Sequence, residues 1–266
     1  MNLLTIIDEY VHEDVMIAFS GGVDSTLLLK MAVEASKKYH THVYAITIQT
    51  ALHLVMEADE AKRMAEEIGA IHKVIHVDEL EGAGIENNPV NRCYLCKKYM
   101  FTKVKELAHS LGISTILEGT NADDLKQYRP GIKAIQELGL HSPLLEANMT
   151  KKEIRELAST YDLKAANKPS SPCLATRFPY NTLLNYEEMR KVEKIEDYLH
   201  TLGFYNVRAR IHNDLVRLEI DQDAFMKCMD KRQEIVLFIK ELGYDYVTLD
   251  LEGFRSGSQD IKLEEK

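Results

Sequence analysis

The sequence predicts an α/β protein with an open parallel sheet, followed by a second, smaller α+β domain. In the first half of the chain, short β-branched or apolar segments alternate with longer helical stretches, which is typical of parallel βαβ units. In the second half, two expected strands follow one another between two helices. The 266 residues, 45% of them hydrophobic, are enough to build two cores.

Four strands and the helices between them define the expected parallel sheet. The strands are predicted at 15–19, 43–48, 73–77 and 115–118, and the helices at 26–38, 57–68 and 94–110. Thr150 and Glu153 form a capping box that opens a further helix, ending near Tyr161. Ligands of open α/β sheets bind beyond the carboxyl ends of the strands, so functional residues are expected directly after them.

A proline-rich segment marks the expected domain junction. Residues 167–182 contain three of the six prolines and no regular periodicity, which predicts a long loop. The predicted organisation is a first domain at 1–166, a linker at 167–182 and a small α+β domain at 183–266. In that small domain we expect helices at 185–202 and 222–242 and strands at 207–211, 216–220 and 246–251.

Composition argues against several functional classes. The chain has 33 Lys plus Arg against 42 Asp plus Glu, a net charge of -9, which argues against broad binding to nucleic acid. No apolar segment approaches the length of a transmembrane helix, and the first residues lack a basic leader, so we expect a cytoplasmic protein without membrane contact. Four cysteines are too few for a disulfide scaffold in a chain of this length.

The segment SGGVDST joins the first expected strand to the first expected helix. Its two glycines let the main chain approach an oxyanion, while its hydroxyl groups and the first helix amides offer hydrogen-bond donors. These features predict a phosphate and pyrophosphate site formed by Ser20, Gly21, Gly22, Asp24, Ser25 and Thr26. Asp24 would lie against phosphate, which we expect to require Mg²⁺. The alternative is an ordinary glycine turn before a helix.

This segment resembles the PP-loop of ATP pyrophosphatases, which include GMP synthetase, NAD synthetase and tRNA thiolases. The resemblance implies an adenine nucleotide alpha hydrolase-like sheet and cleavage of ATP between its α and β phosphates. It also implies that Thr47 lies at the adenine edge, with a plain buried strand as the alternative. Gly119 and Asn121, after the fourth strand, look like a second nucleotide-binding element, with a turn and helix cap as the alternative.

Three cysteines form a pattern with chemical meaning. Cys93 and Cys96 stand at the start of a predicted helix, where thiolates are favoured, and Cys173 stands in the proline-rich loop. Three thiolates leave one iron of a 4Fe-4S cluster open to external sulfide. A redox dithiol, a zinc site with three cysteine ligands and unrelated buried thiols are the alternatives. Cys228 shares an apolar helix face and is expected to be an inert core residue.

Further segments narrow the resemblance. PSSPCLATRFPY at 169–180 and DLEGFRSGS at 250–258, together with SGGVDST and NRCYLC, resemble the LarE family over essentially the whole chain. LarE proteins are PP-loop sulfur transferases that supply the sulfur atoms of the nickel-pincer nucleotide used by lactate racemase. The resemblance implies that ATP adenylates the carboxylates of pyridinium-3,5-biscarboxylate mononucleotide, which become thiocarboxylates, with AMP and pyrophosphate released.

Members of this family differ in their source of sulfur. Some sacrifice the sulfur of the loop cysteine, which corresponds to Cys173, and others resemble cluster-bearing enzymes that pass on sulfide. Because this chain has CxxC as well, the resulting hypothesis is a 4Fe-4S cluster held by Cys93, Cys96 and Cys173, with sulfide as the donor. Loss of sulfur from Cys173 itself remains the alternative.

Charged residues in the second half are candidate ligands of the substrate. Arg177, four residues after Cys173, is placed to neutralise the nucleotide phosphate. By family position, Arg208 and Arg210 look like further phosphate ligands, alternating outward on one strand face, with solvated surface as the alternative. Family position also makes Glu196 and Glu219 candidate metal ligands, against ordinary solvation on a helix or strand face.

Other functions compete with this hypothesis. A tRNA thiolase with a cluster is the first alternative, which the net charge of -9 disfavours. An ammonia-using amide synthetase would have no use for three thiolates, and a nucleotide sensor would not turn over ATP. The family resemblance implies a homo-oligomer, with a hexamer as one form.

Overall fold

The computed structural model of the 266-residue chain describes residues 2–50, 52, 55–126, 129–163, 165 and 173–255, without the side chains of 55–58. Contacts divide the chain into two compact units. Unit 1 comprises the described residues within 1–85 and 91–171, and unit 2 comprises those within 86–90 and 172–266. The predicted linker at 167–182 lies partly outside the described residues, so the predicted domain limits stay a prediction.

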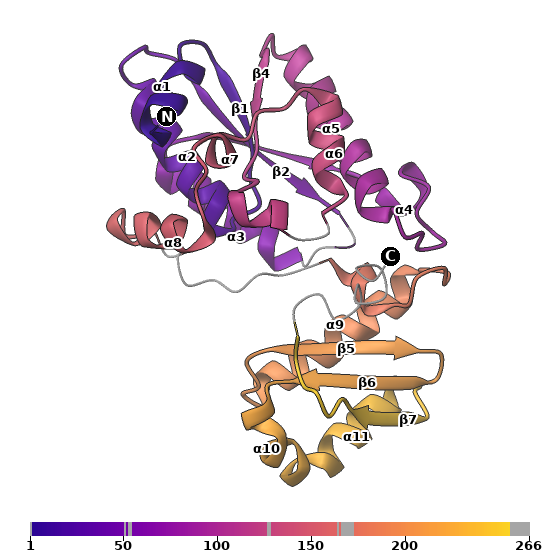
Figure 1. Ribbon diagram of the computed structural model, residues 1–266. Coiled ribbons are helices and arrows are strands. Elements are labelled where there is room, and N and C mark those ends of the chain that lie inside the picture. The colour runs from indigo at the N-terminus through magenta and orange to yellow at the C-terminus, as the bar shows by residue number, and fades with distance from the viewer. Residues whose placement is uncertain are drawn as a thin grey trace. The chain divides into compact units, whose positions relative to one another are not determined.

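Unit 1 contains a four-stranded sheet, and all of its strands are parallel. The strands are β1 (Val15–Ala18), β2 (Val43–Gln49), β3 (Ile71–His76) and β4 (Thr115–Leu117), in the order β3-β2-β1-β4. Val15 is paired with Val43 on one side and with Thr115 on the other. This parallel α/β sheet confirms the predicted fold class (Figure 1).

Helices cover both faces of this sheet because β1 is apolar on both sides. Val15 and Ile17 belong to one buried cluster and Met16 to another, following the two-residue period of a strand. The first cluster includes residues of α1 (Leu3–Tyr10), α2 (Val23–Ser36), α3 (Val55–Ile68), α7 (Pro143–Glu146) and α8 (Lys151–Thr160). The second includes residues of α5 (Arg92–Ser110) and α6 (Gly131–Leu138), which Figure 1 shows on the opposite face.

The strand order places a topological switch point beside β1. The chain leaves β1 through α2 toward β2 on one side, whereas β4 pairs with the other side of β1. The segments that follow β1 and β4 therefore emerge at the same edge of the sheet, where open α/β proteins bind their ligands. Two short helices complete unit 1, α4 (Glu79–Gly82) and the 3₁₀ helix η1 (Ala122–Lys126).

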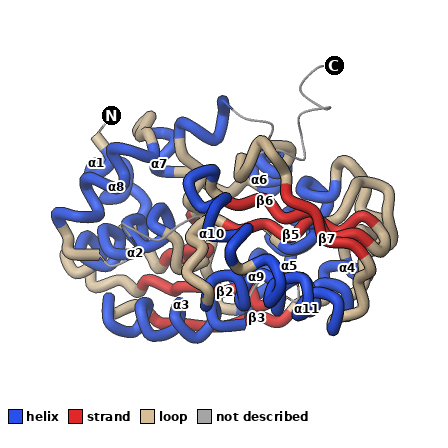
Figure 2. Tube along the Cα trace, turned by 90° about the horizontal axis from the view of Figure 1, so that it is seen from below, coloured by secondary structure: helices blue, strands red, loops and turns tan. Residues whose placement is uncertain are grey.

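Unit 2 is built on a mixed three-stranded sheet. Strand β5 (Val207–His212) pairs antiparallel with β6 (Leu215–Ile220), which pairs parallel with β7 (Tyr246–Leu249). Figure 2 marks these strands in red. Helix α9 (Tyr186–Thr201) packs on β5, and α11 (Arg232–Glu241) packs on β7 and α9. The unit also contains α10 (Phe225–Asp230) and the 3₁₀ helices η3 (Leu174–Arg177) and η4 (Gln222–Ala224).

The prediction of one helix over 222–242 is wrong, because this segment is broken at Lys231. Lys231 is both the last cap of α10 and the first cap of α11, and Arg232 Nη1 donates to the Met229 carbonyl at 2.9 Å. The guanidinium thus takes the place of a main-chain donor, which the last carbonyl groups of a helix lack. The expected burial of Cys228 is confirmed, and burial raises the pKa of its thiol. Of the described helices, none is long and apolar enough to cross a membrane.

Candidate active site

The loop between β1 and α2 is shaped by its own hydroxyl groups. Gly21 has φ +72°, a conformation that glycine adopts without strain. The Gly22 amide donates to Ser20 Oγ at 3.3 Å, while the Gly22 carbonyl accepts from Ser25 Oγ at 3.1 Å and Thr26 Oγ1 at 2.8 Å. These bonds hold an open turn whose following amides, in the first turn of α2, have no intrahelical acceptor and suit an anion.

The segment after β4 packs directly against this loop. A Cβ atom at position 119 would lie 3.2 Å from the Asp24 Cβ and 3.3 Å from the Ser25 nitrogen, so Gly119 permits a close approach. Asn121 Nδ2 also donates to Asp24 Oδ1 at 3.3 Å. The structure thus brings together the residues after β1 and β4 that the sequence singles out, at the switch point of the sheet.

Lys151 is the residue at this edge that the sequence analysis missed. Its ammonium group forms an ion pair with the Asp24 carboxylate, and its main-chain amide donates to Asp123 Oδ2 at 2.8 Å. A lysine thus supplies one positive charge to Asp24, and the expectation that Mg²⁺ binds Asp24 when phosphate is present stays a prediction. One signal was available, since a lysine in the first turn of a helix opposes the helix dipole.

Thr47 has a structural contact at the end of β2. Its hydroxyl donates to the Phe19 carbonyl at 2.9 Å. This bond connects β2 to the start of the loop between β1 and α2 (residues 19–22), which we call the phosphate loop. His72 Nε2 lies 2.9 Å from the Thr47 hydroxyl oxygen. Because this hydroxyl already donates its proton to Phe19, His72 Nε2 is the donor in the second bond. Burial lowers the pKa of His72, so its imidazole is neutral at pH 7.

The carboxylates after β4 organise the turn in which they lie. Buried Glu118 accepts from the Thr120 amide at 3.0 Å and from its hydroxyl at 2.8 Å. Asp124 Oδ2 accepts from the Asn121 amide at 3.1 Å. Hydrogen bonds from the Lys126 side chain and a main-chain amide lower the pKa of Asp123. The turn and cap interpretation of this segment therefore holds alongside its position beside the loop.

The three candidate sulfur ligands belong to both units. Cys93 and Cys96 lie one turn apart at the start of α5, where Cys93 is exposed and Cys96 is half-buried. Cys173 directly precedes η3 in unit 2. Neither unit by itself contains all three, and among the described residues no three His, Cys, Asp or Glu side chains gather as metal ligands.

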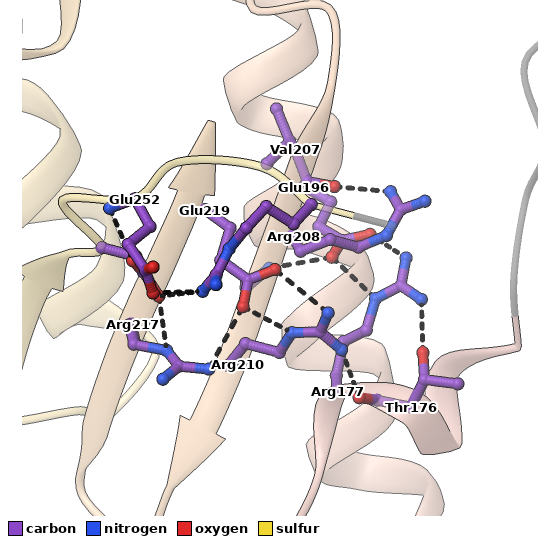
Figure 3. A network of polar contacts seen from close by, with 12 residues as sticks. Thr176, Arg177, Glu196, Val207, Arg208, Arg210, Arg217, Glu219 and Glu252 are labelled. Carbon is purple, nitrogen blue, oxygen red and sulfur yellow. Dashed lines mark hydrogen bonds and ion pairs between the residues drawn. The ribbon is translucent and has the colours of Figure 1, made fainter. Parts of the chain in front are cut away.

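Unit 2 contains a network of arginines and glutamates (Figure 3). Buried Arg177 donates from Nε and Nη2 to both oxygens of Glu196, at 2.9 and 2.7 Å. Glu196 Oε1 also accepts from the Ala209 amide at 2.9 Å. Arg177 Nη1 reaches Thr176 Oγ1 at 2.8 Å and the Cys173 carbonyl at 3.3 Å, so the arginine fixes the main chain at the loop cysteine.

Arg210 and Glu219 form a second bidentate pair in the same network. Both N···O distances are 3.0 Å, and Arg217 Nη2 lies 3.1 Å from Glu219 Oε1. The alternative of solvated side chains is wrong for these two residues, because Arg210 is 7% exposed and Glu219 is fully buried. Glu196 is also buried rather than solvated. The cause is pairing, since each buried charge has an opposite partner.

Arg208 differs from its neighbours in its contacts. Its guanidinium lies 5.0 Å from the centre of the Phe254 ring and donates to the Val207 carbonyl at 2.6 Å, so the described residues give it no carboxylate partner. Burial and the positive charge of Arg177 lower the pKa of Arg208 to about 10. Arg208 stays protonated at pH 7 and is the guanidinium best suited to a further anion. Residues 256–258 of the DLEGFRSGS segment lie outside the described residues.

The similarity of this chain to known proteins covers both units. Residues 1–173 match the family model of the PP-loop domain. Over 249 residues, 94% of this chain and 90% of its relative, the sequence is 38% identical to the pyridinium-3,5-bisthiocarboxylic acid mononucleotide synthase of Lactiplantibacillus plantarum. The chain belongs to the LarE family. Membership of the LarE family confirms the resemblance stated above, and its PP-loop makes the chain an ATP-dependent enzyme.

Two further similar proteins have names that state no activity. An uncharacterised protein of Synechocystis is 37% identical over 244 residues, 91% of this chain and 90% of that protein. Another, from Methanocaldococcus jannaschii, is 31% identical over 249 residues, 94% of each chain. In each of these three matches the similarity extends well beyond residue 173, where the match to the PP-loop domain ends, and into unit 2.

Proposed function

We propose that the enzyme uses ATP to convert the carboxylates of pyridinium-3,5-biscarboxylate mononucleotide into thiocarboxylates, for a nickel-pincer nucleotide. The observation that carries this proposal is the similarity to the L. plantarum synthase, which includes unit 2 as well as the PP-loop unit. The arginine network supports it, because a nucleotide substrate needs a cationic phosphate site.

The first chemical step is activation of the carboxylate. A carboxylate oxygen attacks the α-phosphorus of ATP, the bond to the β-phosphate breaks, and pyrophosphate leaves. The loop amides after Gly22 bind phosphate oxygens, and Lys151 adds positive charge at the same edge. Asp24 would hold Mg²⁺, which would offset the negative charge of the phosphates when bound, while Lys151 turns from Asp24 to the departing pyrophosphate.

The second step replaces AMP by sulfur. Sulfide attacks the carbonyl carbon of the acyl adenylate, and AMP leaves with the electron pair of its bond to that carbon. The substrate phosphate is bound by Arg208, with Arg177 and Arg210 held in place by Glu196 and Glu219. A role for the two glutamates as metal ligands receives no support, because each is already paired with an arginine.

Cys93, Cys96 and Cys173 are the proposed ligands of a 4Fe-4S cluster. Two thiols one turn apart at a helix start are suitable soft ligands, and Cys173 supplies a third from a fixed main-chain position. When bound, such a cluster supplies an iron with an open position for sulfide. The alternative is that Cys173 gives up its own sulfur once and becomes dehydroalanine.

Metal analysis of protein purified without oxygen tests the sulfur source. We expect iron and acid-labile sulfide in the wild type, loss of both in Cys93→Ala, and retention in Cys228→Ala, which removes a buried core thiol instead. Wild-type protein without iron that loses the Cys173 sulfur during turnover would establish the sacrificial route. Release of AMP and pyrophosphate that depends on the pyridinium substrate would distinguish an enzyme of this kind from a sensor or an amide synthetase.

The tRNA thiolase alternative has a separate test. The net charge of -9 predicts that the protein does not retain tRNA at moderate salt. Retention of tRNA together with ATP-dependent thiolation of a base would replace the proposed substrate. We also propose a cytoplasmic homo-oligomer, and sedimentation of the purified protein measures its size.

A further inference from the structure

A short segment before the CxxC sequence is part of unit 2, although the residues on both sides of it belong to unit 1. This segment, Glu86–Val90, bonds to the chain that follows η3. The Asn181 amide donates to the Asn88 carbonyl at 3.0 Å, and the Leu184 amide donates to the Glu86 carbonyl at 2.7 Å. We call residues 86–90 and 178–184, joined in this way, the clasp.

Asn88 is the central residue of the clasp. Its side chain is fully buried, and its Nδ2 donates to two successive carbonyl groups, Phe178 at 3.1 Å and Pro179 at 2.7 Å. Its φ of +48° is unusual for a residue before proline. Within the described residues its buried Oδ1 has no hydrogen-bond partner. Strain and an unsatisfied oxygen both oppose this arrangement, so it depends on the clasp contacts.

The clasp lies at equal sequence distance from the two cysteine-bearing segments. Asn88 precedes Cys93 by five residues, and its partner Phe178 follows Cys173 by five residues. Five residues of extended chain span at most about 18 Å, and one such stretch lies on each side of the bond between Asn88 and Phe178, so the two stretches together allow at most about 36 Å beyond that bond. The main chain between Cys173 and Phe178 is further fixed by η3 and by Arg177.

We propose that Asn88 is a positioning residue that keeps the CxxC segment close to Cys173. This inference rests on the proposed use of the three cysteines together, and it adds the element that joins them. The distance between the sulfur ligands then does not depend on packing alone. The buried side-chain amide of Asn88 binds two main-chain carbonyl groups of the segment that follows Cys173.

Thiol crosslinking tests the clasp without requiring activity or metal. Reduced, iron-free full-length protein is treated with dibromobimane, a short bifunctional thiol reagent, and crosslinks of Cys173 to Cys93 or Cys96 are measured by peptide mass spectrometry. Asn88→Gly is the informative variant, because glycine accepts the positive φ and only the amide contacts are lost. Asn213→Gly is the matched control, an exposed asparagine with φ +58°.

We expect crosslinks in the wild type and in Asn213→Gly, and a loss of about tenfold in Asn88→Gly because the effective concentration of the thiols falls. The Asn181 and Leu184 amides should also exchange faster in Asn88→Gly. A crosslink yield in Asn88→Gly equal to that of the wild type, or no crosslink in the wild type, would overturn the positioning role of Asn88. Wild-type protein that forms the crosslinks but takes up no iron would leave the clasp intact and reject the cluster instead.

Discussion

Buried charge in unit 2 is arranged so that each glutamate orients an arginine. Glu196 and Glu219 each accept two parallel bonds from one guanidinium, which fixes the plane of Arg177 and of Arg210. Such pairs add little net stability, since desolvation offsets attraction, but loss of one partner leaves a buried charge. Their evident effect is to hold the cationic groups in place before any anion binds.

Removal of Arg210 should therefore destabilise the protein far more than removal of Arg217, although both contact Glu219. Arg210→Ala leaves a fully buried carboxylate and is expected to lower the free energy of unfolding by about 3–5 kcal/mol. Arg217→Ala removes a pair whose arginine is 37% exposed, and about 1 kcal/mol is expected. Urea denaturation measures both, and equal losses would contradict this assignment.

Lys151 is expected to act in catalysis as well as in the ligand-free pairing with Asp24. Lys151→Ala should lower the rate of pyrophosphate release by about 100-fold or more, the usual effect of losing one group that stabilises developing charge. Lys151→Arg should recover part of the rate because it keeps the charge. Lys152→Ala is the control, since Lys152 is 85% exposed and pairs with Glu156 at 3.8 Å. An unchanged rate in Lys151→Ala would remove this residue from the mechanism.

At the scale of elements, the capping box of α8 stabilises a helix and also places Lys151, the residue proposed to act on pyrophosphate. Thr150 Oγ1 accepts from the Glu153 amide at 3.4 Å, and the Thr150 amide donates to Glu153 Oε2 at 2.8 Å. Lys151 directly follows this cap. The capping residues that start the helix therefore fix the main-chain position of Lys151, whose ammonium group pairs with Asp24.

Thr150→Ala should thus have two effects. It should cost about 1 kcal/mol of stability, as loss of an N-cap usually does, and it should raise the KM for ATP several-fold through Lys151. Asn185→Ala removes the N-cap of α9, whose Oδ1 accepts from the Glu188 amide at 2.8 Å. That control should lose similar stability without a change in KM for ATP. Thermal unfolding and steady-state kinetics separate the two effects.

Elements with strong local patterns were predictable and short ones were not. The strands of the parallel sheet follow from apolar segments, and the phosphate loop follows from two glycines beside hydroxyl groups. Helices α4 and α7 have four residues each, too few for a helical period to appear. The break at Lys231 depends on a side-chain bond from Arg232 to a carbonyl, which periodicity does not record.

Site residues missed by sequence reasoning owe their positions to contacts between distant parts of the chain. Lys151 lies 127 residues from Asp24, and Asn88 lies 90 residues from Phe178. The burial of Arg210 depends on its pairing with Glu219 on the neighbouring strand. A charged residue in a strand sequence suggests exposure to solvent, and the sequence does not indicate that an opposite charge lies beside it. Sequence patterns predict which residue types suit the chemistry, whereas their partners are set by the fold.

Over the whole molecule, the fold assigns nucleotide binding to one unit. The phosphate loop and the segment after β4 both belong to unit 1 and meet at one edge of its sheet. Addition of α,β-methylene-ATP, which resists cleavage, should slow hydrogen exchange in residues 20–26 and 118–124. The strands β5 and β6 should serve as the internal reference, with unchanged exchange. Protection confined to unit 2 would place the nucleotide elsewhere.

The main chain at Cys173 offers a practical route to the reaction intermediate. Its carbonyl accepts from the Thr176 amide at 3.1 Å, the Thr176 hydroxyl at 2.8 Å and Arg177 Nη1 at 3.3 Å. These contacts survive any change of side chain at position 173. A Cys173→Ala chain should consequently keep the shape of this loop while lacking its sulfur, and it would let an acyl adenylate accumulate for direct crystallographic observation.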